Sequence, residues 1–489
     1  MIAPRVRIVV LGLAGVLLVS GQNTVDREMT AKIRVEGLEH SQALPVFETL
    51  TIEIGPRLTN SPAFKRAIDF ARDRLETYGL ANVHLEPWKF GRGWTLEHLT
   101  VEMVEPRYMP LIGYAEGWSP STPGDLVATP VFLGGKTPAE IESLRASIKG
   151  AIVMTQPIQT AFVRQDRPQP TEGSGDGPPV LSPPALFRGA PEAQRFTTLV
   201  REAGPGVMLR PNVLADGTVY VTGRDAGPSA VPSIVLASEH YNLIARMLEH
   251  KIPVKLRVNI QSKFYDTDLN AYNLIGEIPG TDPALKDQVV MLGAHIDSWH
   301  TGVGATDNAD GTTTMMEAMR ILKAVGARPR RTIRVAIWGG EEQGLLGSKA
   351  WVAQHLSGDA NRQARDNLAV YFNIDNGTGP IYGFALENNA DAKPILDSWL
   401  EPLKDLGVRR NVNLHLTDTD HLSFLAVGVP GFNPFQDYQD YDVRTHHTNM
   451  DMVEHVKPED LRQAAIVMAS FAYNAAMRDR PIPRPQTAH

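Results

Sequence analysis

The sequence predicts an α/β protein in which a mostly parallel central sheet is flanked by helices and the chain is interrupted by an inserted, β-rich domain. Apolar strand-like segments alternate with helical segments over residues 288–476, which is typical of a parallel sheet covered by helices. Residues 289–294 are continuously apolar, as in a strand buried on both faces. The chain has 489 residues, more than one compact core normally contains, so we expect two structural units.

The first folded element is expected to be a helix followed by a strand. Ser61 is a suitable N-cap, Pro62 would occupy the first helical position, and apolar side chains recur at helical spacing as far as Leu75. Alternating apolar and polar residues over 83–88 then predict a strand.

The stretch 114–260 differs in composition from the rest of the chain and is expected to be the inserted domain, so that 22–113 and 261–489 together form the main domain. Residues 156–184 are rich in Pro, Gly, Asp and Ser, which predicts a long exposed loop. No credible cluster of metal ligands occurs in this stretch. Its short β-like runs lie at 150–154, 206–209, 218–221 and 233–236.

The alternation after the inserted stretch defines the elements of the expected parallel sheet. Strands are expected at 289–294, 332–338, 368–374 and 411–416. Helices are expected at 312–325, 345–355, 394–406 and 458–477. In such sheets, ligands bind beyond the carboxyl ends of the strands.

The N-terminal residues 1–21 are expected to be an export signal rather than part of the fold. Arg5 and Arg7 supply a positive start, and an apolar run over 8–19 precedes the small residues Ser20 and Gly21. The run is shorter than the ~20 residues of a membrane span. We therefore expect a secreted or periplasmic protein with no stable membrane association after cleavage; an uncleaved anchor is the alternative.

Composition excludes several classes of function. The formal net charge is -7 and no basic stripe is present, so nucleic acid is not expected as a partner. The chain contains no cysteine, which rules out disulfides, thiolate metal sites and a cysteine nucleophile. Any metal ligands must be His, Asp or Glu.

Such residues follow the predicted strands. His295, the pair Glu341-Glu342 and Asp375 each come at a strand end, and the pair His446-His447 occurs further along. Imidazole nitrogens and carboxylate oxygens together suit zinc. The set exceeds the four ligands of a closed structural site. It fits two metal ions that share a carboxylate, an arrangement that performs hydrolysis.

Each residue taken alone has a simpler interpretation. A lone His295 would be a buried histidine at a strand end, and Asp307 or Asp310 would be turn or helix-cap residues. A doubled glutamate such as Glu341-Glu342 would be a solvated helix start. The joint placement of these residues at one sheet edge favours a metal centre.

Together the motifs resemble those of the co-catalytic di-zinc exopeptidases, a family with aminopeptidase and plasma glutamate carboxypeptidase branches. The matching motifs are His295-x-Asp297, Gly304-Ala-x-Asp307-Asn-x-x-Gly311, Glu341-Glu342-x-Gly-Leu-x-Gly-Ser348, the strand-end Asp375, and His447-Thr-x-x-Asp451. The resemblance covers residues 273–477 well and 52–85 weakly. The stretch 114–260 resembles the protease-associated domain often inserted in this family.

The resemblance implies two Zn²⁺ ions per chain. His295 and Asp375 would bind one zinc, Glu342 and His447 the other, and Asp307 would bridge both. His446 competes with His447 for the last position, but the His-Thr-x-x-Asp pattern starts at His447.

Two further roles and one backbone feature are implied. Glu341 would stay off the metal and act as general base toward a water between the two ions. Asp297 would accept the other ring N–H of His295, because a ligating imidazole usually donates that proton to a carboxylate. The peptide bond between Asp307 and Asn308 would be cis.

The expected function is zinc-dependent exopeptidase activity on short peptides, with an aminopeptidase preferred. A dipeptidase or carboxypeptidase of the plasma glutamate carboxypeptidase type is the first alternative. A single-zinc glutaminyl cyclase and a non-catalytic binding relative are further alternatives, which metal stoichiometry and peptide hydrolysis would separate. The sequence predicts neither the side-chain preference nor the oligomeric state.

Overall fold

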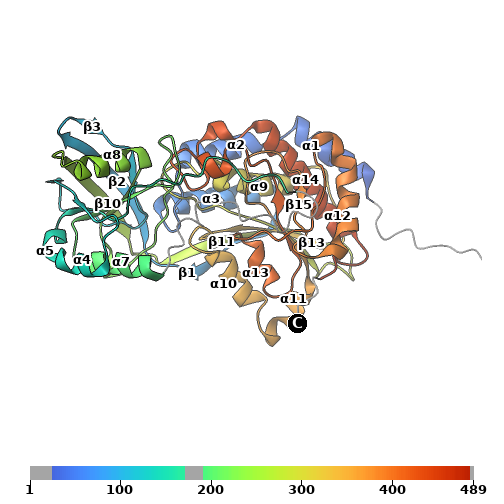
Figure 1. The fold of residues 1–489 in the computed structure, drawn as a ribbon. Helices are drawn as coiled ribbons and strands as arrows, with labels where there is room; N and C mark the ends of the chain where they lie inside the picture. The colour runs from blue at the N-terminus through green and yellow to red at the C-terminus, as the bar shows by residue number, and fades with distance from the viewer. Residues whose placement is uncertain (1–24, 171–190, 485–489) are drawn as a thin grey trace, which may run out of the picture.

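The computed structural model describes residues 25–170 and 191–484 (Figure 1). The predicted export signal and the second part of the predicted 156–184 loop lie outside these residues. Residues 156–170 of that loop form no helix or strand. None of the helices in the described part of the chain combines the length and apolarity needed to cross a membrane.

A six-stranded sheet forms the centre of the catalytic region, in the order β1-β11-β13-β12-β14-β16. Its strands are β1 (Ala81–Lys89), β11 (Asn270–Ile278), β12 (Val289–His295), β13 (Thr332–Trp338), β14 (Leu368–Asn373) and β16 (Gly431–Phe432). The four strands β13, β12, β14 and β16 run parallel, whereas β1 and β11 pair antiparallel at one edge. The prediction of a mostly parallel sheet is therefore confirmed.

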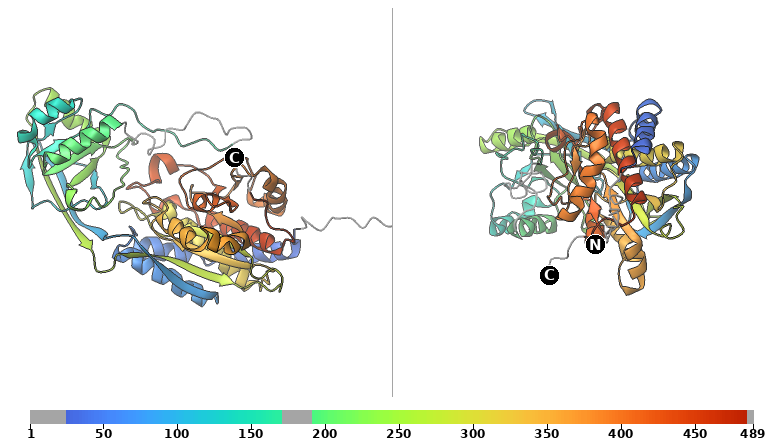
Figure 2. Two further views of the ribbon diagram at one scale, coloured as in Figure 1. Left: turned by 90° about the horizontal axis from the view of Figure 1, so that it is seen from below. Right: turned by 90° about the vertical axis from the view of Figure 1, so that its right-hand side faces the viewer.

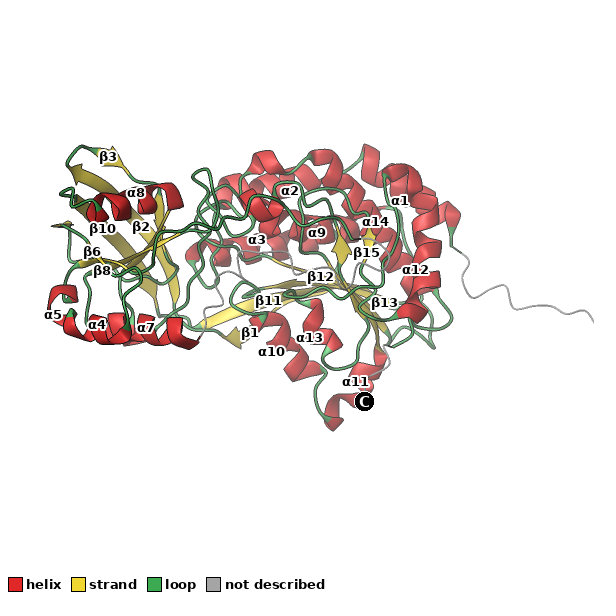
Figure 3. Ribbon diagram, viewed as in Figure 1, coloured by secondary structure: helices red, strands yellow, loops and turns green. Residues whose placement is uncertain are grey.

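Helices cover both faces of this sheet (Figure 3). One face packs against α1 (Arg27–Glu39), α2 (Ala43–Glu48), α3 (Pro62–Thr77), α9 (Asp310–Ala324) and α14 (Pro458–Met477). The opposite face packs against α10 (Leu346–His355), α11 (Arg362–Asn367) and α13 (His421–Leu425). Beyond the sheet lie α12 (Lys393–Leu400), next to α14, and a two-stranded antiparallel sheet of β15 (Gly383–Phe384) and β17 (Pro434–Phe435).

Helix α3 begins as predicted, with Ser61 as its N-cap. The Ser61 hydroxyl accepts a hydrogen bond from the Phe64 backbone N–H at 3.1 Å, and Pro62 occupies the first helical turn. Such a cap satisfies an N–H that has no partner within the helix. Phe64 and Leu75 lie on the buried face.

Residues 93–265 build two further sheets at one end of the molecule (Figure 2). The four-stranded sheet has the order β3-β2-β10-β5, with β2 (Gly93–Glu105), β3 (Met109–Pro110), β5 (Leu126–Ala128) and β10 (Lys255–Tyr265). The five-stranded sheet has the order β4-β9-β8-β7-β6, with β4 (Gly113–Ala115), β6 (Val131–Phe132), β7 (Ile152–Met154), β8 (Val207–Pro211) and β9 (Ser233–Leu236). The helices described in this region are α4 (Pro138–Ser143), α5 (Arg145–Ile148), α7 (Pro191–Glu202) and α8 (Ser238–Glu249).

This region differs from the prediction in two respects. It carries helices as well as strands, and the prediction named only the strands. Its first sheet begins with β2 at Gly93, ahead of the expected boundary at residue 114. The division into domains and the likeness to a protease-associated domain stay predictions.

Two predicted strands are wrong. Residues 218–221 form only an isolated antiparallel bridge between Tyr220 and Thr448, and residues 411–416 only a bridge between Ala385 and Val412. In both places the segment makes backbone hydrogen bonds to a distant stretch of the chain without forming a regular ladder. The Val221 N–H donates to the His447 carbonyl, and the Val412 N–H donates to the Phe384 carbonyl.

Candidate metal centre

The carboxyl ends of β12, β13 and β14 meet at one edge of the central sheet and deliver the predicted residues. His295 is the last residue of β12, and Asp375 follows β14 by two positions. Glu341 and Glu342 follow β13 after the glycines 339 and 340. A parallel sheet places such strand ends side by side, which explains why residues distant in sequence converge.

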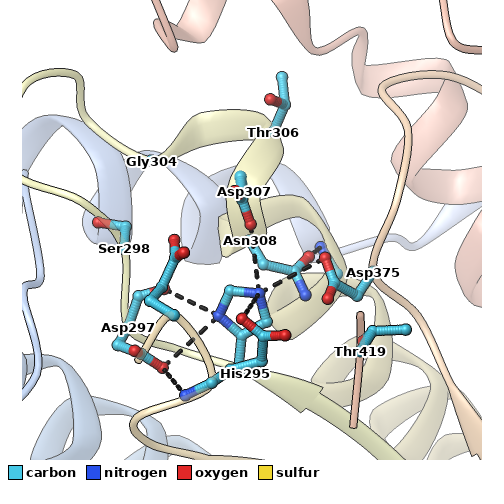
Figure 4. Close-up of polar contacts among 12 residues, drawn as sticks. His295, Asp297, Ser298, Gly304, Thr306, Asp307, Asn308, Asp375 and Thr419 are labelled. Atoms are coloured by element: carbon cyan, nitrogen blue, oxygen red, sulfur yellow. Dashed lines mark hydrogen bonds and ion pairs between the residues drawn. The ribbon is translucent and has the colours of Figure 1, made fainter. Parts of the chain in front are cut away.

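His295 is fully buried at the centre of this group. Its Nε2 lies 3.2 Å from Asp307 Oδ1, 3.5 Å from Asp375 Oδ1 and 3.9 Å from Glu341 Oε2. Figure 4 shows its ring between Asp297 on one side and the pair Asp307 and Asp375 on the other. One imidazole nitrogen therefore faces three carboxylates.

His447 approaches the same aspartate from the other side. Its Nε2 lies 2.8 Å from Glu342 Oε2 and 3.1 Å from Asp307 Oδ2. His446 Nε2 is 4.0 Å from Asp307 Oδ2. Asp307 thus presents one oxygen to His295 and the other to His447, the arrangement expected of a shared carboxylate.

The loop around Asp307 is fixed by hydrogen bonds on both sides. The Thr306 N–H donates to Asp451 Oδ1 at 2.7 Å, and Asn308 Nδ2 donates to the Ile374 carbonyl at 2.9 Å. The peptide bond between Asp307 and Asn308 is cis, as the family resemblance implied. Asp451, the last residue of the predicted His-Thr-x-x-Asp motif, therefore holds the loop that carries Asp307 in place.

Asp297 contacts two of the predicted functional residues. Its backbone carbonyl lies 3.0 Å and its Oδ1 3.5 Å from His295 Nδ1. The Glu341 N–H donates to the same Oδ1 at 3.3 Å, and the Thr59 hydroxyl donates to Oδ2 at 2.6 Å. Asp297 is thus placed to orient both the ring of His295 and the backbone of Glu341.

A buried arginine ties the N-terminal segment to this loop. Arg57 is fully buried, and its guanidinium donates only to backbone carbonyls. The acceptors are Leu50, Gly55, Ile296, Val303 and Gly304, at 2.8–3.1 Å. Burial lowers the pKa of Arg57 to about 10, against the pull of acidic groups nearby. The arginine also places a positive charge beside a strongly acidic cluster.

The buried carboxylates of the centre would be stabilised in their charged form by a cation. Burial, together with the negative charge of Asp307, raises the pKa of Glu342 to about 8 in spite of His447. Burial also raises the pKa of Glu341 well above its usual range. Burial disfavours a charged His295, but Asp375 and Glu341 outweigh it and raise the pKa of the imidazole. Carboxylates at such short separations repel one another unless a positive charge lies between them.

The donor atoms fit a metal ion. Within the described residues, His295 Nε2, Asp307 Oδ2 and both carboxylate oxygens of Glu342 are buried without a hydrogen-bond partner. Buried polar atoms normally have one. Three groups have ligand atoms within 4.8 Å of one another: His295-Asp307-Glu342, His295-Glu341-Asp375 and Asp307-His446-His447. His295 belongs to two of these groups and Asp307 to two, and the group that contains both connects the others, as two adjacent ions would require.

All seven residues predicted for the site converge, and the structure adds contacts that the sequence did not reveal. The Tyr220 hydroxyl lies 3.1 Å from His447 Nδ1. Asp420 is fully buried close to the cluster, where burial raises its pKa to about 7. Neither residue was among those predicted for the site, and nothing in the run 218–221 pointed to Tyr220.

Fold and site together define an α/β protein with a buried centre of two histidines and several carboxylates. The family model "Peptidase family M28" matches residues 273–472. Carboxypeptidase Q of Homo sapiens is 26% identical, covering 92% of this chain and 89% of its own. Aminopeptidase YwaD of Bacillus subtilis (strain 168) is 30% identical, covering 54% and 55%.

A solved structure of a peptidase M28 precursor is also similar to this chain. The crystal structure of a peptidase M28 precursor from Shewanella amazonensis SB2B has a TM-score of 0.72 and 26% identity, covering 94% of this chain and 99% of that one. The match to peptidase family M28 covers residues 273–472, the part of the chain that carries the metal centre.

Proposed function

We propose that this protein is a zinc-dependent exopeptidase that hydrolyses short peptides. The observation that carries the proposal is Asp307, whose two oxygens face His295 at 3.2 Å and His447 at 3.1 Å. A carboxylate shared between two imidazoles is what a pair of adjacent metal ions needs. The match of residues 273–472 to peptidase family M28 supports the same conclusion.

The residues that would hold the metals divide into two sets. His295 and Asp375 would bind one zinc, Glu342 and His447 the other, and Asp307 both. Two zinc ions in such a site lower the pKa of water and polarise the carbonyl of the scissile bond. All five donors are His, Asp or Glu, as a chain without cysteine requires.

The side chains around the metals would direct the proton transfers. Glu341 is buried and its Oε2 lies 3.9 Å from His295 Nε2, so it borders the centre without occupying the Asp307 bridge. We assign it the role of general base, which accepts a proton from the attacking water and returns it to the leaving amine. Asp297 would hold Glu341 and His295 in place.

Two types of exopeptidase are candidates. The sequence favours an aminopeptidase. The likeness to Carboxypeptidase Q spans almost the whole chain, whereas the likeness to Aminopeptidase YwaD spans about half, which favours a carboxypeptidase type as the second candidate.

Metal analysis and peptides with one blocked terminus test the proposal. We expect two zinc ions per chain and hydrolysis of unblocked dipeptides. An aminopeptidase should cleave peptides with an amidated C-terminus and reject N-acetylated ones, and a carboxypeptidase should show the reverse. One zinc with cyclisation of N-terminal glutamine would favour a glutaminyl cyclase, and no hydrolysis of any peptide would favour a binding protein.

The cellular setting is proposed from sequence alone. The predicted signal over 1–21 supports a secreted or periplasmic location. The net charge of -7 supports short peptides rather than nucleic acid as the partner. We further propose that the second unit, expected at 114–260, is a protease-associated-like insertion.

A further inference from the structure

We propose that Tyr220, which the inserted stretch contributes, is a positioning residue that orients His447 for metal binding. This inference rests on the proposed function. It adds that a residue of the stretch 114–260 completes the metal centre, whose proposed ligands all lie later in the chain. Tyr220 lies 227 positions before His447, and the Tyr220 side chain is buried.

The two nitrogens of His447 have different partners. Nε2 faces the carboxylates of Glu342 and Asp307 at 2.8 and 3.1 Å. Nδ1 lies 3.1 Å from the Tyr220 hydroxyl. A ligating imidazole usually donates its other N–H to an oxygen, which fixes the tautomer and the ring orientation. With Tyr220 as acceptor for Nδ1–H, the lone pair of Nε2 is directed toward the metal site.

The other histidine of the centre, His295, has its Nδ1 partner close by in the sequence. His295 Nδ1 lies 3.0 Å from the carbonyl oxygen of Asp297, two residues along the chain. No residue so close in sequence contacts His447 Nδ1 among the described contacts. The two halves of the centre therefore depend on different parts of the chain, so a change at Tyr220 should affect one half only.

Backbone contacts hold Tyr220 against the loop that carries His447. Tyr220 pairs with Thr448 in an antiparallel bridge, and the Val221 N–H donates to the His447 carbonyl at 2.9 Å. His447 has a φ of 59°, a left-handed conformation that is uncommon for a residue other than glycine. The hydrogen bond from Val221 supports the backbone of His447 in that conformation.

Hydrogen bonding and packing within the inserted stretch also hold Tyr220 in place. The Tyr220 N–H donates to Asn212 Oδ1 at 3.1 Å. Val219 and Val221, on either side, are fully buried against Val235 of β9. Tyr220 is thus fixed to the five-stranded sheet and held to His447 at the same time.

Zinc binding to the Tyr220→Phe variant tests the inference. The ring stays in place and only the hydroxyl is lost. In a titration with a zinc-buffering chelator, one of the two zinc equivalents should bind about 10–100-fold more weakly, the range for loss of such a partner. The other equivalent, held by His295 and Asp375, should keep its affinity.

Tyr241→Phe is the matched control. Tyr241 is a buried tyrosine of the same stretch, and its hydroxyl donates to the Gln156 carbonyl at 2.6 Å, far from the residues of the centre. This variant should bind both zinc equivalents as the wild type does. Melting temperatures of the metal-free proteins show whether the two variants lose comparable stability, so that a selective loss of zinc affinity cannot arise from folding.

Unchanged binding of both equivalents in Tyr220→Phe would overturn the inference while leaving the proposed function intact. Equal weakening of both equivalents, or the same weakening in Tyr241→Phe, would also overturn it, because either would indicate a general structural effect. A wild-type protein that binds fewer than two zinc ions and cleaves no peptide would overturn the proposed function itself.

Discussion

Replacement of Glu341 by glutamine separates catalysis from metal binding. Glu341 is 8% exposed, and its backbone N–H donates to Asp297 Oδ1 at 3.3 Å. Glutamine keeps the shape of the side chain and this backbone contact. It removes the negative charge and the ability to accept a proton, so only a role that needs the carboxylate is lost.

The expected effect is a large loss of turnover with zinc retained. Loss of a general base lowers kcat by about 10²–10⁴-fold. At about 1.36 kcal/mol per tenfold, this equals a barrier higher by about 2.7–5.4 kcal/mol. Glu341 Oε2 lies 3.9 Å from His295 Nε2, farther than the nearest oxygens of Asp307 and Asp375 at 3.2 and 3.5 Å. Glutamine at this position therefore leaves the shared carboxylate of Asp307 in place.

The assay is steady-state hydrolysis of the best dipeptide, with zinc measured on the same sample. Glu342→Gln serves as the matched control and should lose zinc as well as activity, because Glu342 Oε2 lies 2.8 Å from His447 Nε2. Unchanged kcat in Glu341→Gln would refute its role as a base. Loss of zinc from that variant would place Glu341 among the ligands, with His295 and Asp375.

Three further changes test the site and the fold. Asp307→Ala should lose both zinc and activity, since it removes the shared carboxylate; full zinc occupancy would show that the bridge lies elsewhere. Arg167→Met should lower the unfolding free energy by about 3–5 kcal/mol, because Asp442, whose side chain is 1% exposed, stays buried without its cation. Burial alone would raise the pKa of Asp442, but pairing with Arg167 outweighs it and lowers that pKa. The stability difference between wild type and Arg167→Met should therefore be complete above pH 3.8, the usual carboxyl pKa, and shrink as the pH falls through the lowered pKa of Asp442. A difference in urea midpoints that does not change with pH would contradict this account. Phe471→Ala should cost about 3–5 kcal/mol in urea unfolding because the ring stacks on Phe384 at 4.4 Å in the core, and a loss below about 1 kcal/mol would contradict the packing.

The sequence predicted the central sheet well because its signals are local. The apolar run at 289–294 and the cap at Ser61 each depend on a few neighbouring residues, and β12 and α3 follow them. The convergence of His295, Glu342 and Asp375 followed from one rule, that parallel strands end at the same edge. Local pattern and sheet geometry together were enough to assemble most of the centre.

What the sequence did not predict depends on contacts between distant segments. Tyr220 belongs to an apolar run that looks like a strand, yet it pairs with Thr448 and contacts His447. Arg57 could not be distinguished from a surface arginine, because its acceptors are backbone carbonyls, which carry no side-chain signature. Such contacts become visible only once the chain is folded.

The distribution of the ligands along the chain has a consequence for synthesis. His295 and Asp307 leave the ribosome well before His447, which faces the second oxygen of Asp307. A nascent chain that has not reached residue 447 therefore carries four of the five proposed ligands and cannot complete the second of the two proposed metal sites. Peptide cleavage that needs both proposed metals would begin only after the segment that carries His447 has docked.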